Sequence, residues 1–177
     1  MKLKLFAIAI LSLLPLSLLS NPVTDMLERI DNGASKKFVI ELKKGDTDFF
    51  ELDQKGNKPV IRGNSWVNIA CGVNWYLKYH AGVHLSWNGM KATLPAVLPA
   101  VAKKERRSTN LSVRYYLNYC TYSYSMAFWD WERWQQELDW MALHGINMPL
   151  AAIGTECVWK NMLTKLGYSK DEINQFI

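Results

Sequence analysis

The sequence predicts an α/β protein in two parts: a small N-terminal α+β unit, then the opening of a parallel α/β architecture. Before position 100, short apolar runs alternate with turn residues, and one longer run has helical spacing. After position 110, strand-like and helix-like runs alternate, which is typical of a parallel sheet. We therefore predict an N-terminal domain at 21–100, a linker at 101–110 and the start of a second domain at 111–177.

Residues 1–20 have the pattern of a Sec signal peptide. Lys2 and Lys4 precede an apolar run at 5–14, and the small residue Ser20 stands at the end of the segment. An uncleaved N-terminal anchor is the alternative. The rest of the chain has no other stretch of about 18 apolar residues, so we expect an exported protein, periplasmic or extracellular, with no membrane contact in its mature form.

In the N-terminal domain we expect a short helix, three strands, a longer helix and a hairpin. Turns that contain glycine separate the strands, and Asn88-Gly89 is a typical hairpin turn. The segment 63–65 supplies a start for the longer helix. The expected elements are, in chain order, the helix 24–32, the strands 38–42, 49–52 and 60–61, the helix 65–82 and the hairpin 83–94.

The segment from Pro95 to Asn110 has the composition of a linker. It contains two prolines and the charged cluster 103–107, which favours a solvated connection over a packed element. The cluster contributes to the net charge of +5, but no nucleic-acid-binding motif accompanies it. We therefore exclude nucleic acid as a partner, and nothing in the pattern favours a particular oligomeric state.

Beyond position 110 the expected order is strand, helix, strand, helix, helix. The run 113–119 is rich in β-branched and aromatic residues, and Asp130 and Gly145 can begin and end the helix that follows. The strand 146–153 is apolar on both faces, so we expect it to be buried between layers. A helix follows from Thr155. Ser169 and Glu172 form a capping box for the last helix.

The three cysteines predict neither a disulfide framework nor a metal site. Cys71, Cys120 and Cys157 are odd in number and widely spaced, so at least one thiol stays free. None belongs to a cluster with the spacing of zinc ligands. We expect no metal and no cofactor.

The end of the first predicted strand of the second domain carries candidate binding residues. Asn118 and Cys120 fall on one face by the two-residue period of a strand, and Tyr124 follows in the loop. An amide, a thiol and a phenol can hold a sugar through hydrogen bonds and ring contacts. The alternative is that Asn118 and Tyr124 satisfy a turn and a core.

A carboxylate, Glu156, stands at the end of the next predicted strand. It can accept a hydrogen bond from a sugar hydroxyl or orient a catalytic acid. Equally, it can be an acidic residue stabilised at a helix N-terminus. Tryptophans at helical spacing could also stack on sugars, but that spacing favours core positions for most of them; these are Trp129, Trp131, Trp134 and Trp140, and Trp131 shares a predicted helical face with Trp134, Leu138 and Met141.

Two groups of segments form a combined pattern: 113–125, 129–134, 139–147, 154–159 and 167–176 in the second domain, and 82–89 and Leu94-Pro95 in the N-terminal domain. Together these segments closely resemble the α-N-acetylglucosaminidase family of glycoside hydrolases. The likeness is strong over 111–177 and looser upstream.

This resemblance implies a small α+β domain, a (β/α)₈ TIM-type barrel and a helical C-terminal domain, of which the first and the truncated start of the second are present. Members are retaining exo-enzymes that remove terminal α-linked N-acetylglucosamine from glycans such as heparan sulfate fragments. The resemblance places Asn118, Cys120, Tyr124 and Glu156 in the sugar pocket. The resemblance also implies that both catalytic glutamates lie on later barrel strands, beyond Ile177. We therefore expect this polypeptide alone to be inactive. The alternative is a non-catalytic carbohydrate-binding or interaction module.

Overall fold

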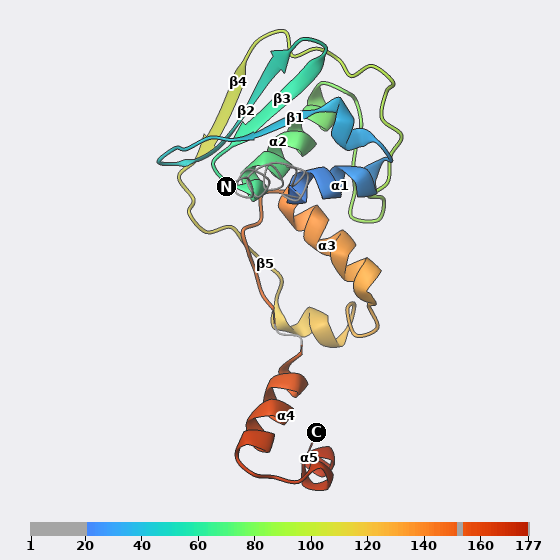
Figure 1. Ribbon diagram of the computed structural model, residues 1–177, viewed down its shortest axis with the longest axis vertical. Coiled ribbons are helices and arrows are strands. Elements are labelled where there is room, and N and C mark those ends of the chain that lie inside the picture. Colours follow the sequence, from blue (N-terminus) through green and yellow to red (C-terminus); the bar gives the residue numbers. More distant parts are fainter. Residues whose placement is uncertain (1–20, 152–153, 177) are drawn as a thin grey trace, which may run out of the picture.

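The computed structural model describes residues 21–151 and 154–176, and the predicted signal peptide lies outside this range. Figure 1 shows a sheet with helices against it and, at the far end of the molecule, two further helices. The first part contains α1 (Pro22–Ile30), the 3₁₀ helix η2 (Ala34–Lys37), β1 (Val39–Leu42), β2 (Asp48–Lys55), β3 (Lys58–Gly63), α2 (Trp66–Tyr79) and β4 (Glu105–Thr109). The second contains β5 (Tyr115–Tyr116), the 3₁₀ helix η3 (Tyr119–Ser123), α3 (Trp131–Leu143), β6 (Met148–Pro149), α4 (Thr155–Lys165) and α5 (Lys170–Phe176).

The first four strands form one mixed sheet in the order β1-β3-β2-β4. The pair β1 and β3 is parallel, whereas β2 runs antiparallel to both β3 and β4. Gly56 adopts a positive φ of 60° in the tight turn between β2 and β3, a conformation that costs glycine little. The three strands predicted between 38 and 61 are confirmed, because turn residues marked their ends.

Helix α2 packs on one face of this sheet, and α1 packs against α2 and closes the core. Ser65 caps α2 by accepting a hydrogen bond from the backbone N–H of Asn68, as the predicted helix start required. Apolar side chains of β2 and β3 pack against the buried face of α2. The members of this core with at most 1% of their surface exposed are Leu27, Ala34, Leu52, Ile61, Ile69, Val73, Tyr76, Leu77, Leu85 and Leu143.

The linker prediction for 101–110 is wrong over Glu105–Thr109. These residues form β4, an edge strand paired with β2 from Asp48↔Thr109 to Leu52↔Glu105. The cations that suggested a solvated segment have a buried partner, because Lys104 and Arg106 both form ion pairs with Glu51 on β2. A buried carboxylate distant in sequence therefore recruits this charged segment into the sheet.

The predicted hairpin at 83–94 is also wrong, since only an isolated bridge joins Ser86 and Gly89 there. The segment is a loop whose hydrogen bonds reach α1: Ala92 N–H donates to Ile30 O, and Leu94 N–H donates to Asp31 Oδ2. Three of its apolar residues are buried in the core, namely Leu85, Met90 and Leu94. The apolar runs on either side of Asn88-Gly89 therefore marked burial and not strands.

The second part contains a parallel strand pair joined by a helix. Tyr115 pairs with Met148 and Tyr116 with Pro149, and α3 connects the two strands. Both strands are shorter than expected, and the buried-strand prediction for 146–153 is wrong: the β6 residues are exposed, because no layer of described residues covers them.

The predicted signals at the helix ends of this part are confirmed, whereas the predicted buried face of α3 is confirmed only at Met141 and, in part, at Trp134. Asp130 caps α3 by accepting from Arg133 N–H, and Ser169 and Glu172 form the capping box before α5. The buried residues of α3 are Glu137, Met141 and Leu143, whereas Trp131 and Leu138 are exposed. Among the described residues, no helix combines the length and apolarity needed to cross a membrane.

Candidate functional site

Arg114 fixes the start of β5 against the first part of the chain. Its guanidinium donates to Asp48 Oδ2 at 2.7 Å, to Asn68 Oδ1 at 3.1 Å and to the carbonyl oxygens of Gly145 and Leu111 at 2.5 and 2.7 Å. The hydrogen bond from Arg114 also lowers the pKa of Asp48. One side chain thus ties β2, α2 and the end of α3 to the strand that leads into the candidate site.

A second contact between the two parts centres on Glu137, which is 0% exposed. Its Oε2 accepts from Trp87 Nε1 at 2.7 Å and from Arg133 Nη2 at 3.0 Å. The Arg133 guanidinium lies 3.8 Å from the Trp129 ring centroid and 4.7 Å from the Trp87 ring centroid. Burial, together with the charge of Glu137, raises the pKa of Tyr116 on β5.

Asn118 lies directly after β5 but not on a strand. Its Oδ1 accepts hydrogen bonds from the backbone N–H groups of Cys120 and Thr121, so the side chain caps η3. The expectation that Asn118 and Cys120 share a strand face is wrong, because this capping turns the chain into a 3₁₀ helix at once. Of the two readings of Asn118, the turn role is confirmed, and its Nδ2 remains without a partner among the described residues.

The residue before Asn118 has an unusual backbone. Leu117 has a φ of 77°, and it is the single non-glycine residue with positive φ in the part of the chain that the structure describes. A left-handed conformation costs a non-glycine residue about 1–3 kcal/mol and persists where the surroundings hold it. Leu117 is buried with Met126 and Met141, which supplies that hold. Residues with such strain cluster at active sites, ligand-binding segments and switch regions.

The other candidates are exposed around the same strand ends. Cys120 and Tyr124 stand on η3 and at its end, and Tyr124 is 78% exposed, so the alternative of a core role for Tyr124 is wrong. Glu156 lies exposed in the first turn of α4, after Gly154 in a left-handed conformation. The Tyr122 hydroxyl donates to Leu150 O, which brings η3 against the segment that leads to α4. No hydrogen bond or ring contact joins Glu156 to the other three candidates among the described residues.

All four candidates therefore follow the carboxyl ends of two neighbouring parallel strands. Asn118, Cys120 and Tyr124 follow β5, and Glu156 follows β6. In an α/β architecture the loops at these ends carry the functional groups.

Sequence reasoning missed the cluster formed by Trp87, Trp129, Arg133 and Glu137. The spacing of Arg133 and Glu137 on a helix was a usable signal, since residues four apart are neighbours. Nothing local indicated that Trp87, fifty residues earlier, would donate to the same carboxylate.

Comparison with known proteins matches both parts of the chain to one family. Residues 21–100 match the family model described as the α-N-acetylglucosaminidase (NAGLU) N-terminal domain, and residues 114–177 match the model of its TIM-barrel domain. Human α-N-acetylglucosaminidase is 41% identical over 147 residues, which cover 82% of this chain and 20% of the human protein. The chain thus spans about a fifth of the length of that curated relative.

Solved structures of a family 89 glycoside hydrolase from Clostridium perfringens are also similar. The complex with 2-acetamido-1,2-dideoxynojirimycin superposes with a TM-score of 0.78 at 36% sequence identity. A variant of that enzyme in complex with its substrate GlcNAc-α-1,4-galactose gives a TM-score of 0.79 at the same identity. Both matches cover 86% of this chain and 18% of the clostridial chain.

Proposed function

This chain belongs to the α-N-acetylglucosaminidase family of glycoside hydrolases, and from this we propose that it forms the N-terminal domain and the first β/α units of the (β/α)₈ barrel of a retaining exo-α-N-acetylglucosaminidase. The proposed substrate is a glycan with terminal α-linked N-acetylglucosamine. We also propose that the protein is exported to the periplasm or the extracellular space.

The observation that carries this proposal is the placement of the candidates after β5 and β6. A parallel β5-α3-β6 unit is the repeat from which such a barrel is built, and barrel enzymes bind substrate at the carboxyl ends of their strands. The free Nδ2 of Asn118 can donate to a sugar oxygen, and Glu156 can accept from a hydroxyl. The exposed Tyr124 ring offers an apolar face, and the Cys120 thiol is small enough to allow close approach of a sugar.

The chemical step requires groups other than these four. Retention of configuration needs two carboxyl groups about 5 to 5.5 Å apart, one as nucleophile and one as acid and then base. We assign neither role to Glu156, because the family takes both glutamates from later barrel strands. The part of the site in this chain binds and orients the terminal sugar.

We expect the isolated 177-residue polypeptide to release no phenol from an aryl α-N-acetylglucosaminide. The reason is that the proposed binding residues are present without the carboxyl pair. The measurement is absorbance of the released phenol over several hours, with buffer as the blank. Hydrolysis above the blank would contradict the division of roles proposed here.

Activity becomes testable if residues 21–177 replace the matching region of the clostridial enzyme. We expect the chimera to hydrolyse GlcNAc-α-1,4-galactose, and Asn118→Ala to lower its kcat/KM by about 10- to 100-fold, the effect of losing one or two hydrogen bonds to the substrate. Asn110→Ala is the matched control, since Asn110 is exposed and lies outside the candidate site, and it should leave kcat/KM unchanged.

Two outcomes would count against this proposal. Equal kcat/KM values for the two asparagine variants would remove Asn118 from the sugar pocket. An inactive but folded chimera, together with disaccharide binding by the isolated chain, would favour the non-catalytic carbohydrate-binding module.

A further inference from the structure

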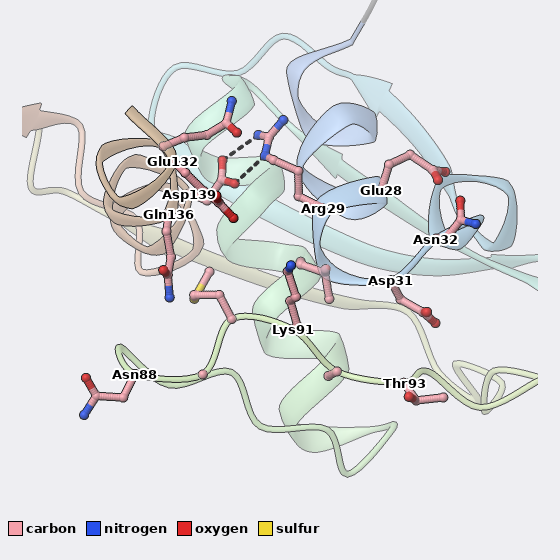
Figure 2. Close-up of a pocket in the computed structure, with 15 residues that line it drawn as sticks. Glu28, Arg29, Asp31, Asn32, Asn88, Lys91, Thr93, Glu132, Gln136 and Asp139 are labelled. Carbon is pink, nitrogen blue, oxygen red and sulfur yellow. Dashed lines mark hydrogen bonds and ion pairs between the residues drawn. The ribbon is translucent and has the colours of Figure 1, made fainter. Parts of the chain in front are cut away.

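A polar hollow of about 990 Å³ lies away from the candidate site, between the end of α1, the loop 88–93 and one face of α3. Figure 2 shows Gln136 and Lys91 extending from opposite walls into the space between α3 and the loop. None of the four candidate sugar-binding residues lines it. We call this hollow the α1–α3 groove.

The walls of the groove are held rigidly. Arg29 on α1 donates to both carboxylate oxygens of Asp139 on α3, with Nε–Oδ2 and Nη2–Oδ1 distances of 2.6 and 2.7 Å (Figure 2). The hydrogen bonds from Ala92 to Ile30 and from Leu94 to Asp31 fix the loop to α1. A preformed site loses less entropy when a ligand binds.

Most polar side chains of the groove are uncommitted. Seven lining residues make no side-chain hydrogen bond or ion pair with any other described residue, and four of them carry primary amides, which both donate and accept. They are Asn32, Asn88, Lys91, Thr93, Glu132, Gln135 and Gln136. Such a set matches a ligand that presents many hydroxyl groups and few charges.

The charges of the groove argue against an anionic ligand. The lining contains the carboxylates of Glu28, Asp31, Glu132 and Asp139 against the cations of Arg29 and Lys91, so acidic groups are in excess. Arg29 neutralises Asp139, and the backbone and hydroxyl donors of Gly33 and Ser35 engage Glu28. Lys37 lies 3.9 Å from Asp31, and Lys91 and Glu132 are one charge of each sign, whereas Glu28 keeps its negative charge. This excess of negative charge disfavours a sulfated ligand, and a neutral ligand avoids the repulsion.

An exposed aromatic residue, Trp131, directly precedes the lining residue Glu132 on α3. Trp131 is 68% exposed and makes no ring contact with a described residue. It lies four positions before Gln135 on α3, so the two side chains are neighbours on the helix. An indole face beside hydrogen-bonding amides is a platform on which the apolar face of a sugar ring can stack.

We propose that the α1–α3 groove binds a neutral oligosaccharide, with Gln135 and Gln136 hydrogen-bonding its hydroxyl groups and Trp131 stacking against one ring. This site is distinct from the one after β5 and β6, and it does not depend on the proposed catalytic function. It would hold a second part of a glycan, or a neighbouring glycan, on the same chain.

The test is a titration of the ¹⁵N-labelled 177-residue chain with GlcNAc-α-1,4-galactose, followed by amide and indole NMR signals. We expect the side-chain amide signals of Gln135 and Gln136 and the indole signal of Trp131 to move together. Trp131→Ala and Gln136→Ala should each weaken this binding at least about five-fold, which is about 1 kcal/mol. Trp131→Phe, which keeps a ring, should restore most of the affinity.

The controls separate this proposal from the previous one. Gln175→Ala removes an exposed helical amide outside the groove, and Asn118→Ala alters the other candidate site; neither should change the titration of the groove signals. Shifts confined to 118–124 would overturn the groove proposal while supporting the sugar pocket. Tighter binding of a sulfated heparin disaccharide in the groove, or no groove shift with about 20 mM disaccharide, would overturn it as well, because a site with a Kd of about 1 mM would be saturated there.

Discussion

Acidification from pH 5 to pH 2 is expected to remove about 3 kcal/mol of folding free energy through Glu51 alone. This carboxylate on β2 is 3% exposed and has three cationic partners, with Nζ of Lys43 at 3.0 Å, Nη1 of Arg106 at 2.7 Å and Nζ of Lys104 at 3.2 Å. Burial by itself raises the pKa of Glu51, but the hydrogen bonds from Lys43, Arg106 and Lys104 outweigh burial and lower the pKa to about 2.

The direction of the pH effect follows from the lowered pKa. A carboxyl whose pKa is depressed in the folded state stabilises the fold above its unfolded value of 4.5, and this contribution is lost as pH falls from 4.5 towards 2. The size follows from about 1.4 kcal/mol for each pKa unit.

Urea unfolding followed by circular dichroism at pH 7, 5, 4, 3 and 2 measures this effect. The difference in unfolding free energy between the wild type and Glu51→Gln should be largest at pH 7 and should shrink towards pH 2, because the neutral amide mimics the protonated acid. Glu132→Gln removes an exposed carboxylate and is the matched control, and its curve should follow the wild type. Parallel curves of unfolding free energy against pH for the wild type and Glu51→Gln would show that ionisation of Glu51 does not stabilise the fold.

The same carboxylate explains why part of the fold could not be predicted. Strands β1 to β3 and the helix starts follow from local signals, since Gly56, Ser65 and Asp130 mark turns and caps where they stand. Strand β4 depends on Glu51, a partner about fifty residues away, and the segment 105–109 by itself has only the composition of a solvated linker. A pairing driven by a distant buried charge leaves no periodic pattern in its own segment.

For the candidate site, position in the chain was predictable and local geometry was not. Family resemblance selected Asn118 and Tyr124, and both follow β5 as expected. The two-residue period predicted a strand through Cys120, whereas the side chain of Asn118 caps a 3₁₀ helix there. Asparagine readily hydrogen-bonds to the backbone of the following residues, and this local bond outcompeted strand propensity.

The helical spacing of apolar residues likewise failed to predict the buried face of α3, because a charged residue is buried there. The expected buried face included Trp131 and Leu138, which are exposed, whereas Glu137 is fully buried. A hydrophobicity pattern treats glutamate as a surface residue. Burial of Glu137 is possible because Arg133 and Trp87 supply its donors, and no pattern within α3 contains Trp87.

Glu137→Ala is expected to lower the free energy of unfolding by about 3–5 kcal/mol, the typical effect of removing one member of a buried ion pair. The change leaves the Arg133 guanidinium partly buried without its carboxylate, and it leaves the Trp87 indole N–H without an acceptor. Urea unfolding at pH 7 gives the difference. Glu132→Ala, an exposed change on the same helix, should stay within about 0.5 kcal/mol of the wild type.

A series of variants separates the charge from the packing around it. Trp87→Phe removes one hydrogen bond to Glu137 and should cost about 1 kcal/mol. Replacing both Arg133 and Glu137 by leucine leaves no unpaired charge, so this double variant should be more stable than Glu137→Ala, although it removes more polar groups. Oε1 of Glu137 and Nη1 of Arg133 already lack a partner among the described residues, which makes the ion pair costly to bury and its apolar replacement favourable. A double variant as unstable as Glu137→Ala would mean that the cluster depends on the contacts of Arg133 with the Trp87 and Trp129 rings and not on the pairing of its charges.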